Sequence, residues 1–169
     1  MPVAERPLFI AVVGSASCDE PIAALARAVG QEIGRRGAVL VCGGRGGVME
    51  AACQGAKAQG GITVGILPGA DRRQANRYVD IPVVTGLGDA RNAVVVRSAD
   101  AVVAVSGGYG TLSEIGLALK MGRPVVGLGT WELSQQGQPV AAIVRADTPL
   151  QAVEAAIALA AKMRIGEEE

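Results

Sequence analysis

The sequence predicts a three-layer α/β fold, a mostly parallel sheet of about six or seven strands with helices on both faces. Half of the residues are hydrophobic but only 2% are aromatic, so the core must consist of Ala, Val, Ile and Leu, which are typical of buried parallel sheets. Short apolar runs alternate with longer amphipathic stretches, as in repeated βα units. The length of 169 residues suits one domain, so we expect residues 1–169 to form a single domain.

The expected strands are the short apolar runs of the chain. They are rich in Val, Ile, Leu and Ala, and most of them end at glycine, proline or polar residues. We expect strands at residues 8–13, 39–41, 63–67, 79–84, 101–105, 124–127 and 142–144. Because helical stretches separate most of these runs, we expect them to pair in parallel.

The expected helices are the amphipathic stretches between those strands. They are residues 17–36, 48–59, 88–97, 111–121 and 148–163. Ser17 to Glu20 and Thr148 to Gln151 have the spacing of a capping box, and a proline suited to a first helical turn accompanies each pair. Gly37 is the expected end of the first helix.

Charge and composition exclude several classes of function. Sixteen Lys and Arg residues balance sixteen Asp and Glu residues, so no overall field attracts nucleic acid or an anionic membrane surface, and we expect neither partner. Histidine is absent, which removes the usual general base of a Ser or Cys hydrolase and the commonest transition-metal ligand. We predict no metal site.

The cysteines and the first residues of the chain favour a cytoplasmic location. Cys18, Cys42 and Cys53 form an odd set without a CxxC pair, which is typical of a reducing compartment. Residues 1–15 contain acidic and proline interruptions, and their apolar run is too short for a signal peptide or a membrane span. We therefore expect a cytoplasmic protein.

Glycine-rich turns after the first two strands are candidate ligand-binding segments, because open parallel sheets bind ligands beyond the carboxyl ends of their strands. In the second turn, four glycines would let the backbone approach a ligand, and the following helix offers unpaired N–H groups and a positive dipole end, which together make a phosphate cradle. Arg45 would add a bidentate contact. We expect binding by Gly14, Ser15, Gly43, Gly44, Arg45, Gly46 and Gly47. Alternatively, these glycines only form tight turns.

The turn after the fifth strand places a carboxylate close to the expected ligand. Its expected binding residues are Gly107, Gly108, Tyr109, Gly110 and Thr111. Glu114 follows one helical turn later, where a carboxylate could stabilise positive charge developing on a sugar ring or position a water for glycosidic cleavage. Two alternatives stay open. Thr111 and Glu114 also have capping-box spacing, and Tyr109 either fills the loop or forms a platform for a base.

Arginines near the strand ends are the candidate partners of a phosphate or of Glu114. Arg91 enters a helix after the fourth strand, and Arg97 lies nearly two turns further along. An arginine beside Glu114 would give the site both a cation and an anion, although solvated arginines on helix faces are common. The loop 68–77 could cover the site, and its charged run 71–73 is either solvated or in contact with phosphate.

At these residues the chain resembles the LOG family of lysine-decarboxylase-like proteins, whose characterised members cleave cytokinin nucleotides to the free base and ribose 5-phosphate. Residues 106–114 match the family signature PGGxGTxxE at every position except the leading proline, and residues 42–49 are similar to its glycine cluster GGGxxGLM. Arg91 corresponds to the family's arginine after the fourth strand. The resemblance implies a Rossmann-like fold, a nucleoside 5′-monophosphate ligand, and catalytic roles for Arg91 and Glu114.

The chain also departs from the active members of that family. They resemble one another in an Arg-Lys pair and two adjacent glutamates, whereas this chain has Asn92 after Arg91 and Ser113 before Glu114. Residues 107–128 resemble a branch of shorter bacterial proteins that is also similar to the molybdenum-cofactor carrier protein of algae. Those carriers oligomerise and hold a phosphate-bearing pterin without transforming it. This resemblance implies a homodimer or homotetramer that binds molybdenum cofactor.

Three functions remain open from the sequence. The protein is a nucleoside 5′-monophosphate phosphoribohydrolase, which requires no cofactor, or a carrier or sensor that binds a nucleotide or molybdopterin, or a structural homo-oligomer whose ancestral site is empty. The first two need the same pocket for a phosphate-bearing small molecule. Turnover of the ligand separates them.

Overall fold

The computed structural model describes residues 6–166 and confirms the predicted three-layer α/β fold. Within these residues, seven strands form one parallel sheet in the order β4-β3-β2-β1-β5-β6-β9. They are β1 (Phe9–Val13), β2 (Val39–Cys42), β3 (Ile62–Leu67), β4 (Ile81–Val84), β5 (Ala101–Val105), β6 (Val125–Leu128) and β9 (Ile143–Ala146). The chain builds outward from β1 in one direction and from β5 in the other, so the topological switch lies between β1 and β5.

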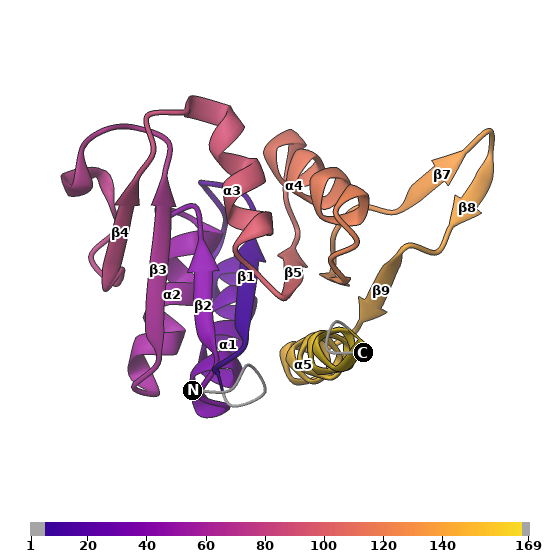
Figure 1. Cartoon of the computed structure of the whole chain (residues 1–169), viewed down its shortest axis with the longest axis horizontal. Coiled ribbons are helices and arrows are strands. Elements are labelled where there is room, and N and C mark those ends of the chain that lie inside the picture. Colours follow the sequence, from indigo (N-terminus) through magenta and orange to yellow (C-terminus); the bar gives the residue numbers. More distant parts are fainter. Residues whose placement is uncertain (1–5, 167–169) are drawn as a thin grey trace.

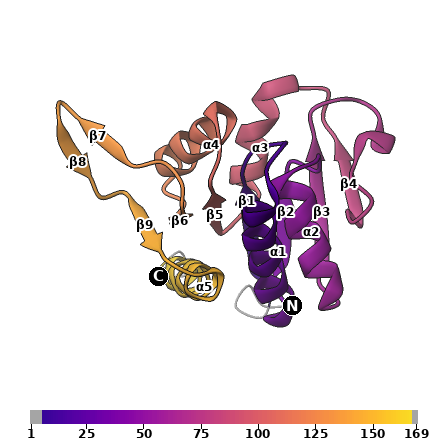
Figure 2. The same ribbon diagram turned by 180° about the vertical axis from the view of Figure 1, so that it is seen from behind.

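Helices cover both faces of the sheet (Figures 1 and 2). One face carries α1 (Glu20–Arg35), α2 (Val48–Ala58) and α5 (Pro149–Gly166), and the other carries α3 (Arg91–Arg97) and α4 (Tyr109–Lys120). Two short 3-10 helices, η2 (Arg72–Gln74) and η3 (Gly88–Ala90), lie in the connections beside β4. No helix in residues 6–166 has the length and hydropathy that a membrane-spanning segment requires.

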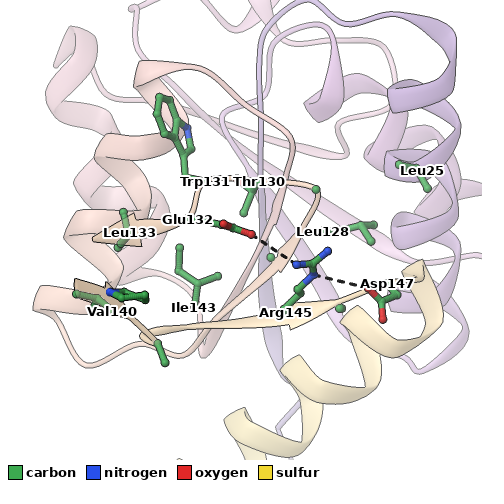
Figure 3. Close-up of a pocket in the computed structure, with 15 residues that line it drawn as sticks. Leu25, Leu128, Thr130, Trp131, Glu132, Leu133, Val140, Ile143, Arg145 and Asp147 are labelled. Carbon is green, nitrogen blue, oxygen red and sulfur yellow. Dashed lines mark ion pairs between the residues drawn. The ribbon is translucent and has the colours of Figure 1, made fainter. Parts of the chain in front are cut away.

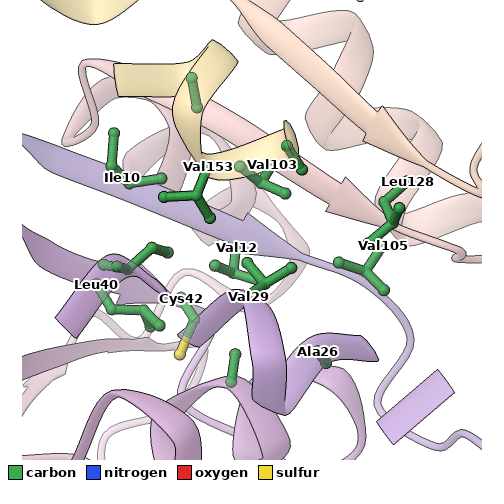
Figure 4. Packing of buried hydrophobic residues seen from close by; sticks show 14 of the residues in the cluster. Ile10, Val12, Ala26, Val29, Leu40, Cys42, Val103, Val105, Leu128 and Val153 are labelled. Carbon is green, nitrogen blue, oxygen red and sulfur yellow. The ribbon is translucent and has the colours of Figure 1, made fainter. Parts of the chain in front are cut away.

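Aliphatic side chains fill both interfaces between the sheet and its helices. Every residue of β5 is buried, which places this strand in the middle of the core. Val12 and Val103 from the sheet pack with Val29 of α1 and Val153 of α5 in one cluster (Figure 4). Ile115 of α4 belongs to the cluster on the opposite face. This double burial explains why the strands appear in the sequence as continuous apolar runs.

One of the two predicted helix caps is confirmed and the other is wrong. Thr148 caps α5, and its hydroxyl accepts a hydrogen bond from the N–H of Gln151 at 3.2 Å. The cap of α1 is Asp19 rather than Ser17, and its carboxylate accepts a backbone bond in the first turn at 3.1 Å. Pro21 gives the reason. With Asp19 as the cap, this proline lies in the first turn, where a backbone N–H is not needed, whereas a start at Ser17 would place it deeper in the helix.

An antiparallel hairpin formed by β7 (Leu133–Gln135) and β8 (Gln138–Val140) was not predicted from the sequence. Both turn residues, Gln136 and Gly137, have positive φ angles, of 52° and 77°, as in the tight turns that join two-stranded hairpins. The hairpin projects from the body of the domain beside β9 (Figures 1 and 2). Its strands are polar and mostly exposed, so they lack the apolar pattern from which the other strands were predicted.

Candidate functional site

The three glycine-rich turns lie together at the carboxyl ends of the central strands. They follow β1, β2 and β5, which are neighbours in the sheet and run parallel. The turn after β1 lies between the other two. The carbonyl of Ser15 accepts a hydrogen bond from the N–H of Val48 at 3.0 Å, and a Cβ built on Gly108 would lie 3.7 Å from the Ser15 hydroxyl.

The glycine cluster at residues 43–47 is packed closely against other parts of the protein. Gly44 and Gly47 have φ angles of 75° and 63°, which favour glycine. A Cβ on Gly47 would overlap the backbone of the turn at Ser15, and a Cβ on Gly43 would lie 2.7 Å from Nη1 of Arg91. The close approaches for which these glycines leave room are therefore approaches to the protein's own backbone and side chains.

Arg45 and the loop 68–77 extend this cluster toward solvent. Arg45 is exposed and lies 3.5 Å from the side-chain oxygen of Gln74. Asn76 ties the loop to the cluster, because its side chain donates to the carbonyl of Arg45 at 2.9 Å and its N–H donates to Gly44 at 2.8 Å. In the charged run, Arg73 pairs with Asp71 at 2.9 Å within the loop itself. The loop thus lies beside the glycine turn, as its position in the sequence suggested.

The turn before α4 is open by contrast. Gly108 is the cap residue of α4 and provides no side chain to bond the first N–H groups. Gly108, Tyr109 and Gly110 are all exposed, and no atom lies within 4 Å of a Cβ built on Gly110. Thr111 is 2% exposed, and its hydroxyl has no hydrogen-bond partner among the residues that the structure describes. Free N–H groups at the positive end of a helix dipole form an anion-binding geometry.

Glu114 is not part of a helix cap. Because α4 begins at Tyr109 with Gly108 as its cap, Thr111 is already the third residue of the helix and Glu114 lies one turn further inside. The capping-box alternative for Thr111 and Glu114 is therefore wrong. The extended backbone of Gly108, with φ of −105° and ψ of −154°, starts the helix earlier than the threonine spacing suggested.

Glu114 and Arg91 are brought together beneath the turns. Glu114 is 8% exposed, and burial raises the pKa of its carboxyl to about 7, although the positive charge of Arg91 opposes this effect. Burial also lowers the pKa of Arg91. Nη1 of Arg91 donates to the carbonyls of Gly43 and Ile66, both at 2.6 Å, and its buried Nε has no partner within residues 6–166. Arg91 is thus anchored to the ends of β2 and β3.

The two departures from the hydrolase pattern contact each other. The side-chain amide of Asn92 donates to the hydroxyl of Ser113 at 3.0 Å, and this hydroxyl donates to the carbonyl of Gly110 at 2.7 Å. Asn92 is next to Arg91 in α3, and Ser113 is next to Glu114 in α4. A neutral hydrogen bond therefore links the two helices beside the acid and the guanidinium.

Sequence reasoning missed the segment after β6, which supports the open turn. The hydroxyl of Thr130 donates to the carbonyl of Ser106 at 2.6 Å, and the indole N–H of Trp131 donates to that of Gly108 at 3.1 Å. The rings of Trp131 and Tyr109 lie 6.0 Å apart between centroids, with 30° between their planes. A cavity of about 500 Å³ opens beside Trp131 (Figure 3). The signal available in the sequence was the single tryptophan of the chain, placed just beyond a strand end.

No metal centre accompanies these turns in the part of the chain that the structure describes. Within residues 6–166, no three Cys, Asp or Glu side chains are grouped so that they could hold a metal ion. Cys18, Cys42 and Cys53 are free thiols. Cys42 and Cys53 lie 3.5 Å apart between their Sγ atoms in the core.

Comparison with known proteins identifies the family of the chain. The sequence profile of the SLOG cluster4 family matches residues 7–158. The chain belongs to this family. It is 38% identical to the molybdenum cofactor binding protein of Rippkaea orientalis, with a TM-score of 0.83, over 92% of this chain and 98% of that one. It is also 38% identical to the molybdenum cofactor carrier protein of Chlamydomonas reinhardtii, with a TM-score of 0.81, over 93% of this chain and 99% of that one.

A third relative is an enzyme. The chain is 40% identical over 94 residues to the cytokinin riboside 5′-monophosphate phosphoribohydrolase of Mycobacterium marinum. This match covers 54% of the chain and 50% of the relative, so it spans about half the length of that enzyme. Together these relatives confirm the resemblance to LOG-like and molybdenum-cofactor carrier proteins that the glycine-rich motifs indicated.

Proposed function

We propose that the protein binds a phosphate-bearing pterin of the molybdenum-cofactor type at the open turn before α4, and holds it without cleaving it. The phosphate accepts hydrogen bonds from the free N–H groups of Tyr109, Gly110 and Thr111, with the dipole of α4 behind them. The unpartnered Thr111 hydroxyl and the nearly buried Glu114 lie in the same helix. The similarity to the molybdenum cofactor proteins of two organisms over most of their length supports this ligand.

The observation that carries this proposal is the hydrogen bond between Asn92 and Ser113. The hydrolases that the chain resembles have a lysine and a glutamate at these two positions. The neutral pair removes one base and one acid from beside Arg91 and Glu114, while the turn that would hold a phosphate is kept. Retained binding with a reduced set of charged groups is expected of a carrier rather than of a hydrolase.

The test measures binding and turnover on the same protein. Purified protein is mixed with molybdenum cofactor, and mass spectrometry of the intact complex is expected to show the added mass. Incubation with AMP or isopentenyladenosine monophosphate at saturating concentration is expected to release no free base by liquid chromatography. Failure to bind the cofactor, or release of a base, would overturn the proposal. A thermal-shift screen in which no nucleotide and no pterin raises the melting temperature would favour a structural protein with an empty site.

Glu114 favours a second candidate, a nucleoside 5′-monophosphate phosphoribohydrolase. A carboxyl with a pKa of about 7 beside an arginine can give up or accept a proton near neutral pH, as a catalytic acid must. Under this hypothesis, Arg91 orients the ribose phosphate and Glu114 assists cleavage of the N-glycosidic bond. Release of adenine from AMP that disappears in Glu114→Gln, with AMP binding retained, would establish this candidate.

Assembly and location are proposed with the same function. We propose a homodimer or homotetramer in the cytoplasm, with no nucleic-acid or membrane partner. Exposed apolar side chains support self-association. Those on β9 and α5 include Val144, Leu150 and Ile165. Light scattering after size-exclusion chromatography tests the assembly, and a monomeric mass would overturn it.

A further inference from the structure

We propose that the cavity beside Trp131 holds a flat heteroaromatic ring, the ring of the ligand whose phosphate binds at the turn before α4. This inference rests on the proposed function and adds where the organic part of the ligand lies. Nothing in the glycine-rich motifs points to this cavity, because it is lined by residues between 127 and 147 together with Leu25 of α1. The apolar walls of the cavity, the polar groups at one side of it and its connection to the turn each support this occupant.

The walls of the cavity are apolar. The end of β6, the β7–β8 hairpin and β9 enclose it together with one side chain of α1 (Figure 3). The apolar side chains that line it include Leu25, Leu128, Leu133, Val140 and Ile143. The volume of about 500 Å³ lies within the range of small-molecule sites, which are mostly apolar with a few polar groups that fix orientation.

Polar groups lie at one side of the cavity. Arg145 is placed between Glu132 and Asp147, at 3.5 Å and 3.8 Å (Figure 3). All three side chains are more than three-quarters exposed, so their ion pairs are weak and readily exchanged for bonds to a ligand. They offer both donors and acceptors. Apolar walls with such an edge suit a pterin or purine, whose faces are apolar and whose edges carry nitrogen and oxygen atoms.

Two hydrogen bonds connect the cavity to the phosphate turn. Trp131 and Thr130 both line the cavity, and their side chains donate to the carbonyls of Gly108 and Ser106. Gly108 is also the cap of α4, so Trp131 of the cavity is hydrogen-bonded directly to the proposed phosphate site. The cavity and the proposed phosphate site are therefore adjacent.

The sheet order places the cavity and the anchor of Arg91 on opposite sides of the turn. The turn follows β5, the cavity lies at the ends of β6 and β9, and Arg91 is anchored at the ends of β2 and β3. Neighbouring strands lie about 4.8 Å apart, so β2 and β6 are separated by roughly 14 Å. A ring in the cavity lies away from the guanidinium of Arg91. This separation adds to the neutral pair of Asn92 and Ser113 in disfavouring cleavage of a bond beside the ring.

The experiment fills the cavity and compares ligands with and without a ring. Val140→Trp fills it from the hairpin and Leu25→Trp fills it from α1. Val83→Trp is the matched control, because Val83 is 38% exposed on β4 at the far edge of the sheet and Val140 is 39% exposed. Calorimetry measures the affinities for neopterin monophosphate, GMP and ribose 5-phosphate. Circular dichroism checks that each variant is folded.

Of neopterin monophosphate and GMP, we expect each cavity variant to bind the tighter ligand about tenfold or more weakly than the unmodified protein does. The affinity for ribose 5-phosphate is expected to change by less than about twofold. The control is expected to change neither. Unchanged affinity for the ring-bearing ligands in both cavity variants overturns the inference. If the oligomeric mass of these variants changes at the same time, the cavity belongs instead to an interface with a second copy of the chain. Equal loss for ribose 5-phosphate also overturns it, because the phosphate turn is then the part affected. If the unmodified protein binds none of the three ligands, it is the proposed function that fails.

Discussion

Replacing Glu114 with Gln tests whether burial governs the behaviour of this carboxyl. Glu114 is 8% exposed, and burial raises its pKa to about 7 against the attraction of Arg91. Glutamine has almost the same shape but stays neutral at every pH. The substitution therefore removes the buried charge and leaves the packing of α4 in place.

The magnitude follows from the difference between the folded and unfolded states. In the unfolded chain the carboxyl ionises near its usual pKa of 4.5, and in the folded protein it ionises near 7. The folded state thus holds the proton more tightly, so the free energy of unfolding falls as the pH rises from about 4.5 to 7 and is constant above that range. The full loss is about 3 kcal/mol. We expect Glu114→Gln to be more stable than the unmodified protein by roughly 2 to 3 kcal/mol at pH 8, and by about 1 kcal/mol or less at pH 5.

Urea unfolding followed by circular dichroism at pH 5 and pH 8 measures this difference. Glu132→Gln is the control, because its side chain is 87% exposed, and we expect it to change stability by less than about 0.5 kcal/mol at either pH. An equal effect of Glu114→Gln at both pH values would refute the reasoning. It would mean that the folded protein stabilises the charged carboxylate as well as water does.

Three further predictions concern the glycines, one partly buried ion pair and the neutral contact between α3 and α4. In thermal unfolding, Gly47→Ala is expected to lower the free energy of unfolding by about 2 kcal/mol or more, because φ is 63° and a Cβ would overlap neighbouring backbone. Gly116→Ala is the control in open space on α4, and it is expected to raise the free energy of unfolding by about 0.5 to 1 kcal/mol. Asp100→Ala is expected to cost about 2 to 4 kcal/mol in urea unfolding, because its carboxylate accepts the first N–H of β1 and pairs with an arginine of α5, both at 2.7 Å. Asn92→Lys combined with Ser113→Glu is expected to release adenine from AMP in a chromatographic assay while neither single variant does. Absence of adenine from the double variant would show that the neutral pair is not what prevents cleavage.

The sheet was predictable from the sequence because burial on both faces leaves a strong local pattern. The run at residues 101–105 coincides with β5, and each of its residues is buried. The hairpin at residues 133–140 was not predictable, since its strands are polar and exposed and its turn begins with Gln136 at a positive φ. Its position depends on β6 and β9, which it connects, rather than on an apolar pattern of its own.

The meeting of the glycine-rich turns at the carboxyl ends of the strands was predictable, but how closely each turn is packed was not, and which of them binds phosphate stays a prediction. The sequence favoured residues 43–47 as the phosphate cradle, with Arg45 as a contact. A glycine that makes room for the protein's own groups looks the same in a sequence as one that makes room for a ligand. Only the tertiary structure shows Gly47 against the backbone at Ser15 and Gly43 against Arg91, while Gly110 faces open space.

The open turn before α4 leaves a phosphate-bearing ligand two directions in which its ring can extend. Toward β2 lies Arg91, which acts on the buried acid Glu114 of α4, whose pKa is about 7. Toward β6 lies the cavity beside Trp131, whose carboxylates, Glu132 and Asp147, are exposed and paired with an arginine. Cleavage needs the bond beside the ring to lie near the buried acid, and storage needs it to lie elsewhere. Under the proposed function, the direction of the ring and the neutral pair of Asn92 and Ser113 act together, and Glu114 alone is not sufficient for cleavage.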